Sequence, residues 1–204
     1  MNTQQLTPLS ETQVEDMLRD SGALMEGHFL LTSGRHSQFY VEKFRLLEQP
    51  GVTSQLCTEL ARRFANDNIQ CVIGPVTGGI ILAFEVARQL GCRAVYAERG
   101  ENGQGFVLRR GFQLQPGERV IIVEDIVTTG GSALQVVELA QEHGADVLGV
   151  GLLVDRSGGK ANFGVDRVEP LLRMNIETYA PDEVPAKLTE KFGPAIKPGS
   201  SKKA

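Results

Sequence analysis

One stretch of the sequence combines acidic, hydroxyl and glycine residues at a spacing that suits a phosphorylated sugar. Glu124 and Asp125 directly follow the wholly apolar run Val120–Val123. The small or hydroxylated residues Thr128–Ser132 then lead into a helical pattern. Backbone N–H groups of such a loop form a concave anion site, and the helix N-terminus adds positive charge. The neighbouring carboxylates would accept hydrogen bonds from the sugar hydroxyls, so the stretch predicts a sugar phosphate site.

A plainer interpretation of this loop is an ordinary strand–turn–helix in which Thr129 or Ser132 caps the helix. The acidic pair at the end of an apolar strand favours the sugar phosphate instead. Other phosphate motifs do not fit. The sequence has no Gly-x-x-x-x-Gly-Lys-Ser/Thr, which excludes a P-loop, and the pair Gly149 and Gly151 lacks the third glycine of a dinucleotide fingerprint.

The elements that would hold this loop alternate between strands and helices. Short apolar runs predict strands at residues 71–73, 94–97, 120–123 and 147–154. Helical spacing predicts helices from Ser10, with a capping box to Gln13, from Pro50, and at residues 80–90 and 131–143. The alternation indicates an α/β fold with a mostly parallel sheet flanked by helices, whose ligands bind beyond the carboxyl ends of the strands.

The N-terminal part does not follow this alternation. Residues 28–31 and 39–41 predict two short strands around a turn. We therefore expect residues 1–48 to form a helix and a small N-terminal hood, residues 49–192 the core, and residues 193–204 a disordered tail.

Composition excludes several classes of protein. The chain has 204 residues, of which 41% are hydrophobic and 23% charged, as in globular proteins. Its three cysteines are widely spaced, which indicates reduced thiols, and its three histidines show no metal-ligand spacing. No apolar run reaches ~18 residues and the N-terminus has no signal pattern, so we expect a cytoplasmic protein without a membrane partner. The net charge of −4 gives no reason to expect nucleic acid binding.

The run Val120–Ser132 resembles the phosphoribosyl pyrophosphate-binding signature of the type I phosphoribosyltransferases. Three further stretches resemble the orotate phosphoribosyltransferases, especially their branch from thermophilic bacteria. Residues 27–40 are similar to the segment that introduces the hood, and residues 73–80 to the loop that approaches pyrophosphate. The pair Asp155 and Arg156 matches the Asp-Arg whose arginine binds orotate.

The resemblance implies a type I phosphoribosyltransferase fold and transfer of the phosphoribosyl group to orotate, giving orotidine 5′-monophosphate and pyrophosphate. The catalytic residues would be Glu124, Asp125 and Arg99. The phosphoribosyl group would bind Glu124, Asp125, Ile126, Val127, Thr128, Thr129, Gly130, Gly131 and Ser132. Orotate would contact Thr128 and Arg156, and pyrophosphate Thr77, Gly78, Arg99, Arg109 and Arg110. Mg²⁺ would be held mainly by substrate and water, and the protein would be a homodimer.

The chemistry of Arg156 also favours orotate, because a planar guanidinium can donate two parallel hydrogen bonds to the orotate carboxylate. The alternative is a surface arginine paired with Asp155. The lid at residues 99–105 departs from the family: it is short and keeps only Arg99, with Gly100 where lysine is common. We hypothesise that Arg109 and Arg110 supply the missing charge, although they could also be solvated residues of a β-hairpin.

Two other functions stay open from the sequence. A phosphoribosyltransferase for a purine base would share the signature loop but would not need Arg156. A non-catalytic regulator of the same fold would bind RNA, which the acidic net charge disfavours.

Overall fold

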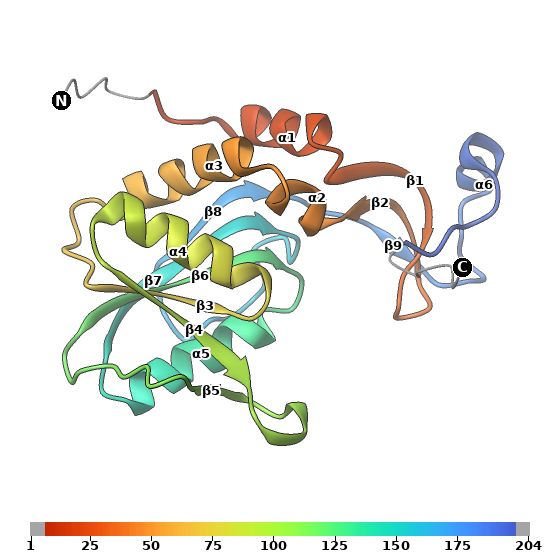
Figure 1. Cartoon of the computed structure of the whole chain (residues 1–204). Helices are drawn as coiled ribbons and strands as arrows, with labels where there is room; N and C mark the ends of the chain where they lie inside the picture. The colour runs from red at the N-terminus through yellow and green to blue at the C-terminus, as the bar shows by residue number, and fades with distance from the viewer. Residues whose placement is uncertain (1–6, 199–204) are drawn as a thin grey trace.

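A computed structural model describes residues 7–198 of the chain. Its centre is a six-stranded sheet in the order β5-β4-β3-β6-β7-β8, in which only β5 runs antiparallel to its neighbour (Figure 1). The strands are β3 Cys71–Pro75, β4 Arg93–Arg99, β5 Phe106–Leu108, β6 Arg119–Val127, β7 Asp146–Asp155 and β8 Val168–Arg173. The predicted mostly parallel α/β sheet is confirmed.

Helices cover both faces of this sheet because its central strands are apolar on both sides. The helices are α1 Glu11–Asp20, α3 Pro50–Arg63 and α4 Gly78–Leu90 on one face, and α5 Gly131–Glu142 on the other (Figure 1). Ile121 and Val123 belong to the core cluster on the side of α1, α3 and α4. Val120 and Ile122 belong to the cluster on the side of α5, and all four side chains are fully buried. Each such burial contributes roughly 1.5–3 kcal/mol.

The predicted helix starts are confirmed by their capping contacts. Ser10 precedes α1: its Oγ accepts from Gln13 N at 3.2 Å, and its own N–H donates to Gln13 Oε1 at 2.9 Å. This capping box satisfies two N–H groups that the helix leaves free. Pro50 is the first residue of α3, where its missing N–H costs no hydrogen bond.

The hood is built from both ends of the chain, so its predicted limit at residue 48 is wrong. A second sheet in the order β1-β2-β9 contains β1 Leu24–Leu30, β2 His36–Val41 and β9 Thr178–Tyr179. The short helices α2 Lys43–Leu47 and α6 Ala186–Phe192 accompany it (Figure 1). Strand β9 lies inside the range expected for the core, and long-range strand pairing places it in the hood instead.

Part of the expected disordered tail is ordered. Ile196 N donates to His28 O at 2.9 Å, and Leu30 N donates to Ile196 O at 2.8 Å, so residue 196 runs beside β1. Residues 199–204 lie outside the described part of the chain. Backbone hydrogen bonds of this kind carry no local sequence pattern, which is why the polar tail gave no sign of them.

The histidines are closer together than their sequence spacing indicates. His28 Nε2 and His36 Nδ1 lie 2.8 Å apart across the β1–β2 hairpin, and His28 Nδ1 bonds to Gly193 O at 2.9 Å. Within residues 7–198, no three His, Cys, Asp or Glu side chains gather as a metal-ligand group. No helix in that same range has the length and apolar character needed to cross a membrane.

Candidate active site

Two helix N-termini meet the acidic pair at one edge of the sheet. Strand β3 leads into α4 and the adjacent strand β6 leads into α5, so both helices begin at the carboxyl ends of parallel strands. The N-cap residues Thr77 and Gly130 make no side-chain cap to their helices. The first-turn N–H groups of both helices are therefore available to anions, which the helix dipoles also favour.

The loop after β6 has the shape that an anion site needs. Thr128, Thr129 and Gly131 are exposed, while Gly130 is buried with a φ of +84°. A side chain at Gly130 would be strained by that φ, and its Cβ would lie 3.0 Å from the Cβ of Ala161. Glycine thus permits the tight turn that directs the loop's backbone toward solvent.

The acidic pair lies within the last part of a strand, which corrects the prediction that the strand ends before it. Strand β6 continues to Val127, and Glu124 pairs with Leu152 of β7. On its other side β6 pairs with β3 only as far as Ile122. The pairing between β3 and β6 therefore ends before the two carboxylates, while the pairing with β7 continues past them and holds their backbone in place.

Asp125 is buried, with 3% of its surface exposed, and only one of its two carboxylate oxygens accepts a hydrogen bond among the described residues. Its Oδ1 accepts from Ile126 N at 2.7 Å, whereas Oδ2 has no hydrogen-bond partner within the described chain. Gly78 lies directly against Oδ2, so that a Cβ there would overlap this oxygen. The start of α4 and the carboxylate thus occupy one small site, in which Gly78 lies against the acidic pair.

Lys43 is a site residue that the sequence analysis missed. Its Nζ lies 2.9 Å from Asp125 Oδ2, although it is not aligned to donate to that oxygen, and 3.3 Å from Oδ1, to which it does donate. This ion pair links the segment that follows the hood strand β2 to the core. The contact spans 82 positions in the sequence, and no local motif marks a lone lysine after a hood strand.

Glu124 is protonated more readily than an ordinary glutamate. Burial, reinforced by the charge of Asp125, raises its pKa from 4.5 to about 8, although Lys43 and Arg99 act in the opposite direction. Ionising two adjacent carboxylates in a buried strand costs free energy, because burial and the repulsion of like charges both disfavour the second charge. Glu124 is therefore largely neutral near neutral pH and can also donate a hydrogen bond.

We expect Glu124→Gln to stabilise the protein at alkaline pH. Between pH 4.5 and 8 folded Glu124 keeps a proton that the unfolded chain has lost, so the free energy of unfolding of the wild type falls as pH rises. Glutamine is neutral throughout. The stability of the variant relative to the wild type should increase by on the order of 1–3 kcal/mol between pH 4.5 and pH 8 in urea unfolding. A difference independent of pH would contradict the raised pKa.

Arg156 stands at the end of β7 beside the phosphate loop. The backbone N–H of Arg156 donates to Val127 O at 2.8 Å. The side-chain Nε is buried and has no hydrogen-bond partner among residues 7–198. Burial lowers its pKa, and the nearby Tyr40 of the hood opposes this shift. Asp155 accepts from Ser157 N and Oγ at 2.8 and 2.6 Å, which disfavours the alternative of a simple Asp155–Arg156 pair. A buried donor without a partner indicates a ligand acceptor.

The lid arginines do not lie together. Arg99, the last residue of β4, donates from Nη2 to Ser132 Oγ at 3.0 Å. Arg110 donates instead to both carboxylate oxygens of Glu98, at 2.8 and 3.2 Å. The lid between them contains the 3₁₀ turn η1 Glu101–Gly103. In this arrangement Arg110 is paired with Glu98, away from Arg99, and the joint role of Arg99, Arg109 and Arg110 toward pyrophosphate stays a prediction.

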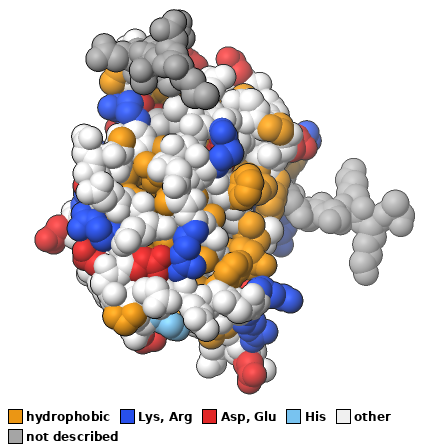
Figure 2. Space-filling model, turned by 60° about the vertical axis from the view of Figure 1, so that its left-hand side comes forward, with side chains coloured by type: hydrophobic (Ala, Val, Ile, Leu, Met, Phe, Trp, Pro, Cys, Tyr) orange, Lys and Arg blue, Asp and Glu red, His pale blue; other side chains and the backbone are white. Residues whose placement is uncertain are grey.

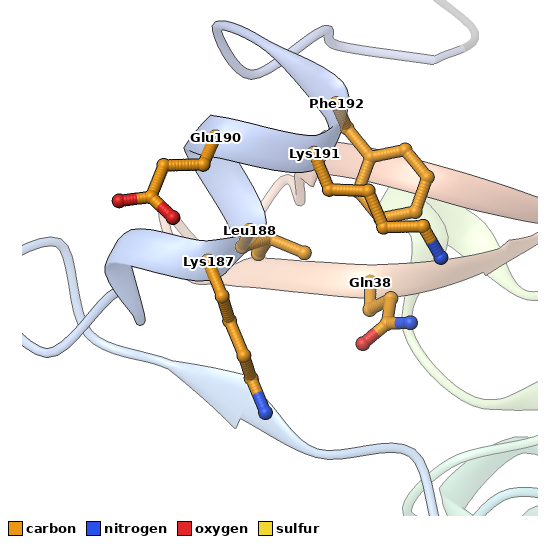
Figure 3. A pocket seen from close by; sticks show the side chains of 6 residues that line it. All are labelled: Gln38, Lys187, Leu188, Glu190, Lys191 and Phe192. Atoms are coloured by element: carbon orange, nitrogen blue, oxygen red, sulfur yellow. The ribbon is translucent and has the colours of Figure 1, made fainter.

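A separate hollow of about 510 Å³ lies on the far side of the hood, under α6 (Figure 3). It is lined by Gln38, Lys187, Leu188, Glu190, Lys191 and Phe192. Lys191 Nζ forms an ion pair with Glu26 Oε1, at a distance of 3.0 Å. The hollow lacks glycine-rich backbone and buried carboxylates, so the strand ends remain the candidate site.

Comparison with known proteins agrees with this geometry. Residues 48–164 match the phosphoribosyl transferase domain family. The chain is 50% identical to the orotate phosphoribosyltransferase of Desulforamulus reducens over 94% of this chain and 98% of the relative. It is 48% identical to that of Thermotoga maritima over 92% and 97%. The crystal structure of orotate phosphoribosyltransferase from Aeropyrum pernix covers 87% of this chain and 97% of its own, with 26% identity and a TM-score of 0.67.

Proposed function

The chain belongs to the phosphoribosyltransferase family, among its orotate phosphoribosyltransferases, and we infer from this that it makes orotidine 5′-monophosphate. It transfers the 5-phosphoribosyl group from 5-phosphoribosyl 1-pyrophosphate to orotate and releases pyrophosphate. The observation that carries the choice of base is the Nε of Arg156 beside the phosphate loop, which is buried and has no hydrogen-bond partner among residues 7–198. A guanidinium in that position suits the orotate carboxylate, which a purine base lacks.

We propose that the chain binds the ribosyl donor across the two helix N-termini. The loop Thr128–Ser132, which is exposed at Thr128, Thr129 and Gly131, suits the 5′-phosphate. Glu124 and Asp125 suit the ribose hydroxyls. Thr77 and Gly78 at the start of α4 suit the pyrophosphate, because the Thr77 side chain does not cap the helix and the first-turn N–H groups can bind an anion. Thr128 would contact orotate together with Arg156.

The substitution occurs at the anomeric carbon of the ribose. A ring nitrogen of orotate forms the new bond to this carbon and gives up its proton to the departing pyrophosphate or to water. The bond from the carbon to the pyrophosphate oxygen breaks, and its electron pair leaves on pyrophosphate. If breaking runs ahead, positive charge develops on the ribose. The buried carboxylate of Asp125, beside Lys43, would stabilise that charge. Because the strand already holds it in place, no free energy is spent on reorganising the site during the reaction.

The residues at this site fit a magnesium ion that the substrate carries. Their donor set is hard oxygen, with Asp125 Oδ2 lacking a hydrogen-bond partner within the described residues. Mg²⁺ prefers such ligands and commonly keeps substrate oxygens and water around it. Glu124 and Asp125 would face it, largely through ribose hydroxyls and water. When bound, it would neutralise charge on the pyrophosphate.

Release of pyrophosphate in the presence of the donor and a base tests the proposed function. Orotate should support turnover, followed by its absorbance, and chelation of Mg²⁺ should abolish it until the ion is restored. Adenine or xanthine as the preferred base would show a purine enzyme instead. RNA binding that weakens with salt, without any pyrophosphate release, would show a regulator.

We propose that the protein is a homodimer. Ile81 and Phe84 on α4 are 42% and 65% exposed, and Phe44 on α2 is 50% exposed. Apolar side chains also gather along one side of the face seen in Figure 2, where basic and acidic side chains are interspersed. Exposed apolar clusters favour association. Light scattering should give twice the chain mass, and Phe84→Glu should give monomers; a monomeric wild type would refute the dimer.

We also propose that the protein works in the cytoplasm. Cys57, Cys71 and Cys92 are free, and burial raises the pKa of the first two thiols to about 12, so they are unreactive as well as unpaired. Such thiols suit a reducing compartment. Cell fractionation should recover the protein with cytoplasmic markers, and recovery with an exported fraction would contradict the proposal.

A further inference from the structure

Lys43 is held in a defined position by the short helix α2 that it begins. The last two residues of this helix, Leu46 and Leu47, are buried, and Thr53 Oγ1 of α3 donates to Leu46 O at 2.9 Å. Leu47 also packs against the start of α4, where its Cδ1 lies 3.2 Å from the position that a Cβ of Gly78 would take. Because Lys43 and Leu47 are four residues apart, they share one face of the helix, and Lys43 is directed to the same place.

The ammonium of Lys43 lies across both oxygens of the Asp125 carboxylate. Its Nζ is 3.3 Å from Oδ1, to which it donates, and 2.9 Å from Oδ2. Oδ1 also accepts from Ile126 N at 2.7 Å, so two donors, one from strand β6 and one from helix α2, hold the same oxygen. A carboxylate held by two donors cannot turn freely about its Cβ–Cγ bond, and Oδ2 therefore stays beside Gly78 at the start of α4.

Apolar side chains line the inner side of this ion pair. Lys43 and Asp125 border a small internal cavity of about 10 Å³, whose other walls are apolar side chains such as Val41 and Leu46. The side chain of Lys43 is 31% exposed, and that of Asp125 only 4%. Opposite charges attract each other more strongly where water is partly excluded, and the loss of one partner leaves the other buried without compensation. The contact therefore fixes Asp125 more firmly than an exposed ion pair would.

We propose that Lys43 is a positioning residue for the reaction, which holds the Asp125 carboxylate in the orientation in which it meets the ribose. This rests on the proposed function, in which Asp125 faces the ribose and its developing positive charge. Lys43 directly follows the hood strand β2, so the orientation of the carboxylate depends on where the hood lies. The hood thereby controls a group of the core as well as covering the site.

Steady-state kinetics of Lys43→Met with orotate and the ribosyl donor test this role. Methionine keeps the length of the side chain and removes its charge, so kcat should fall about three- to tenfold, while the KM for orotate stays within about twofold. Lys43→Arg can donate to both carboxylate oxygens, and it should recover most of the loss. Lys191→Met, which removes an exposed hood lysine paired with Glu26 at 3.0 Å, should change neither constant.

A double-mutant cycle shows whether Lys43 acts through Asp125. In an Asp125→Asn background, Lys43→Met should change kcat by less than about twofold, because the carboxylate that Lys43 holds is already absent. A loss as large as in the wild-type background would mean that Lys43 acts on the substrate directly, and it would overturn the proposal. Urea unfolding checks each variant, and if Lys43→Met does not fold, Lys43→Gln compared with Lys43→Arg provides the same test.

The outcomes separate this inference from the function on which it rests. If the wild type transfers the phosphoribosyl group to orotate and Lys43→Met keeps the kcat of the wild type, the inference alone is overturned. If the wild type shows no transfer, calorimetry with ribose 5-phosphate replaces the kinetics. An affinity that falls in Lys43→Met, recovers in Lys43→Arg and no longer responds to Lys43→Met after Asp125→Asn would support the role of Lys43 while the proposed function fails. Equal affinities in all these variants would overturn both.

Discussion

Replacing Asp125 by Asn is expected to lower the turnover number for orotidine 5′-monophosphate formation at least about tenfold. The carboxylate is 3% exposed, fixed by the bond from Ile126 N, and keeps Oδ2 without a hydrogen-bond partner in the described chain. Asparagine can keep the bond from Ile126, but it has no charge to stabilise a cationic ribose. The effect should fall on turnover more than on orotate affinity.

Steady-state kinetics and thermal unfolding of this variant separate the chemical effect from a folding defect. Lys43 loses its partner in Asp125→Asn, but its side chain is 31% exposed and can be solvated, so the fold should stay stable. Asp146→Asn is the matched control, since that aspartate is 52% exposed and lies at the opposite end of the sheet, at the start of β7. Full turnover in Asp125→Asn would exclude its proposed role.

The second large effect is expected from Arg156→Met, which keeps the length of the side chain and removes the guanidinium. The loss of a charged, forked donor should lower kcat/KM for orotate by about ten- to a hundredfold. Ribose 5-phosphate binding should be unchanged. Because the Nε of Arg156 is buried without a partner among residues 7–198, its removal should leave stability equal or higher.

Arg173→Met provides the control for this substitution, since Arg173 is exposed on the neighbouring strand β8. Kinetics at varied orotate concentration, together with calorimetry, give the measurement. If Arg156→Met kept the orotate KM of the wild type, the base would have to bind elsewhere, and a purine specificity would regain support.

Local sequence patterns predicted the central strands and the helix starts well, because these features depend on residues that lie close together in the sequence. The run Val120–Val123 is apolar throughout, and it is indeed buried on both faces of the sheet. Ser10 with Gln13, and Pro50, marked helix starts through capping chemistry that acts within one turn. The loop Thr128–Ser132 opens α5 as its composition predicted.

The features that the sequence did not reveal all depend on contacts between distant segments. Strand β9 joins the hood through pairing with β2, and Lys43 meets Asp125 across 82 positions. Strand β6 continues through the acidic pair because β7 pairs with it that far, which strand propensity cannot show for Glu124 and Asp125. Such pairings depend on the tertiary arrangement.

A crystal structure with orotidine 5′-monophosphate bound tests the central claim most directly. We expect the 5′-phosphate at residues 128–132, the ribose hydroxyls at Glu124 and Asp125, and the base carboxylate at Arg156. A nucleotide bound with its phosphate away from this loop, for instance in the hollow under α6, would contradict the account.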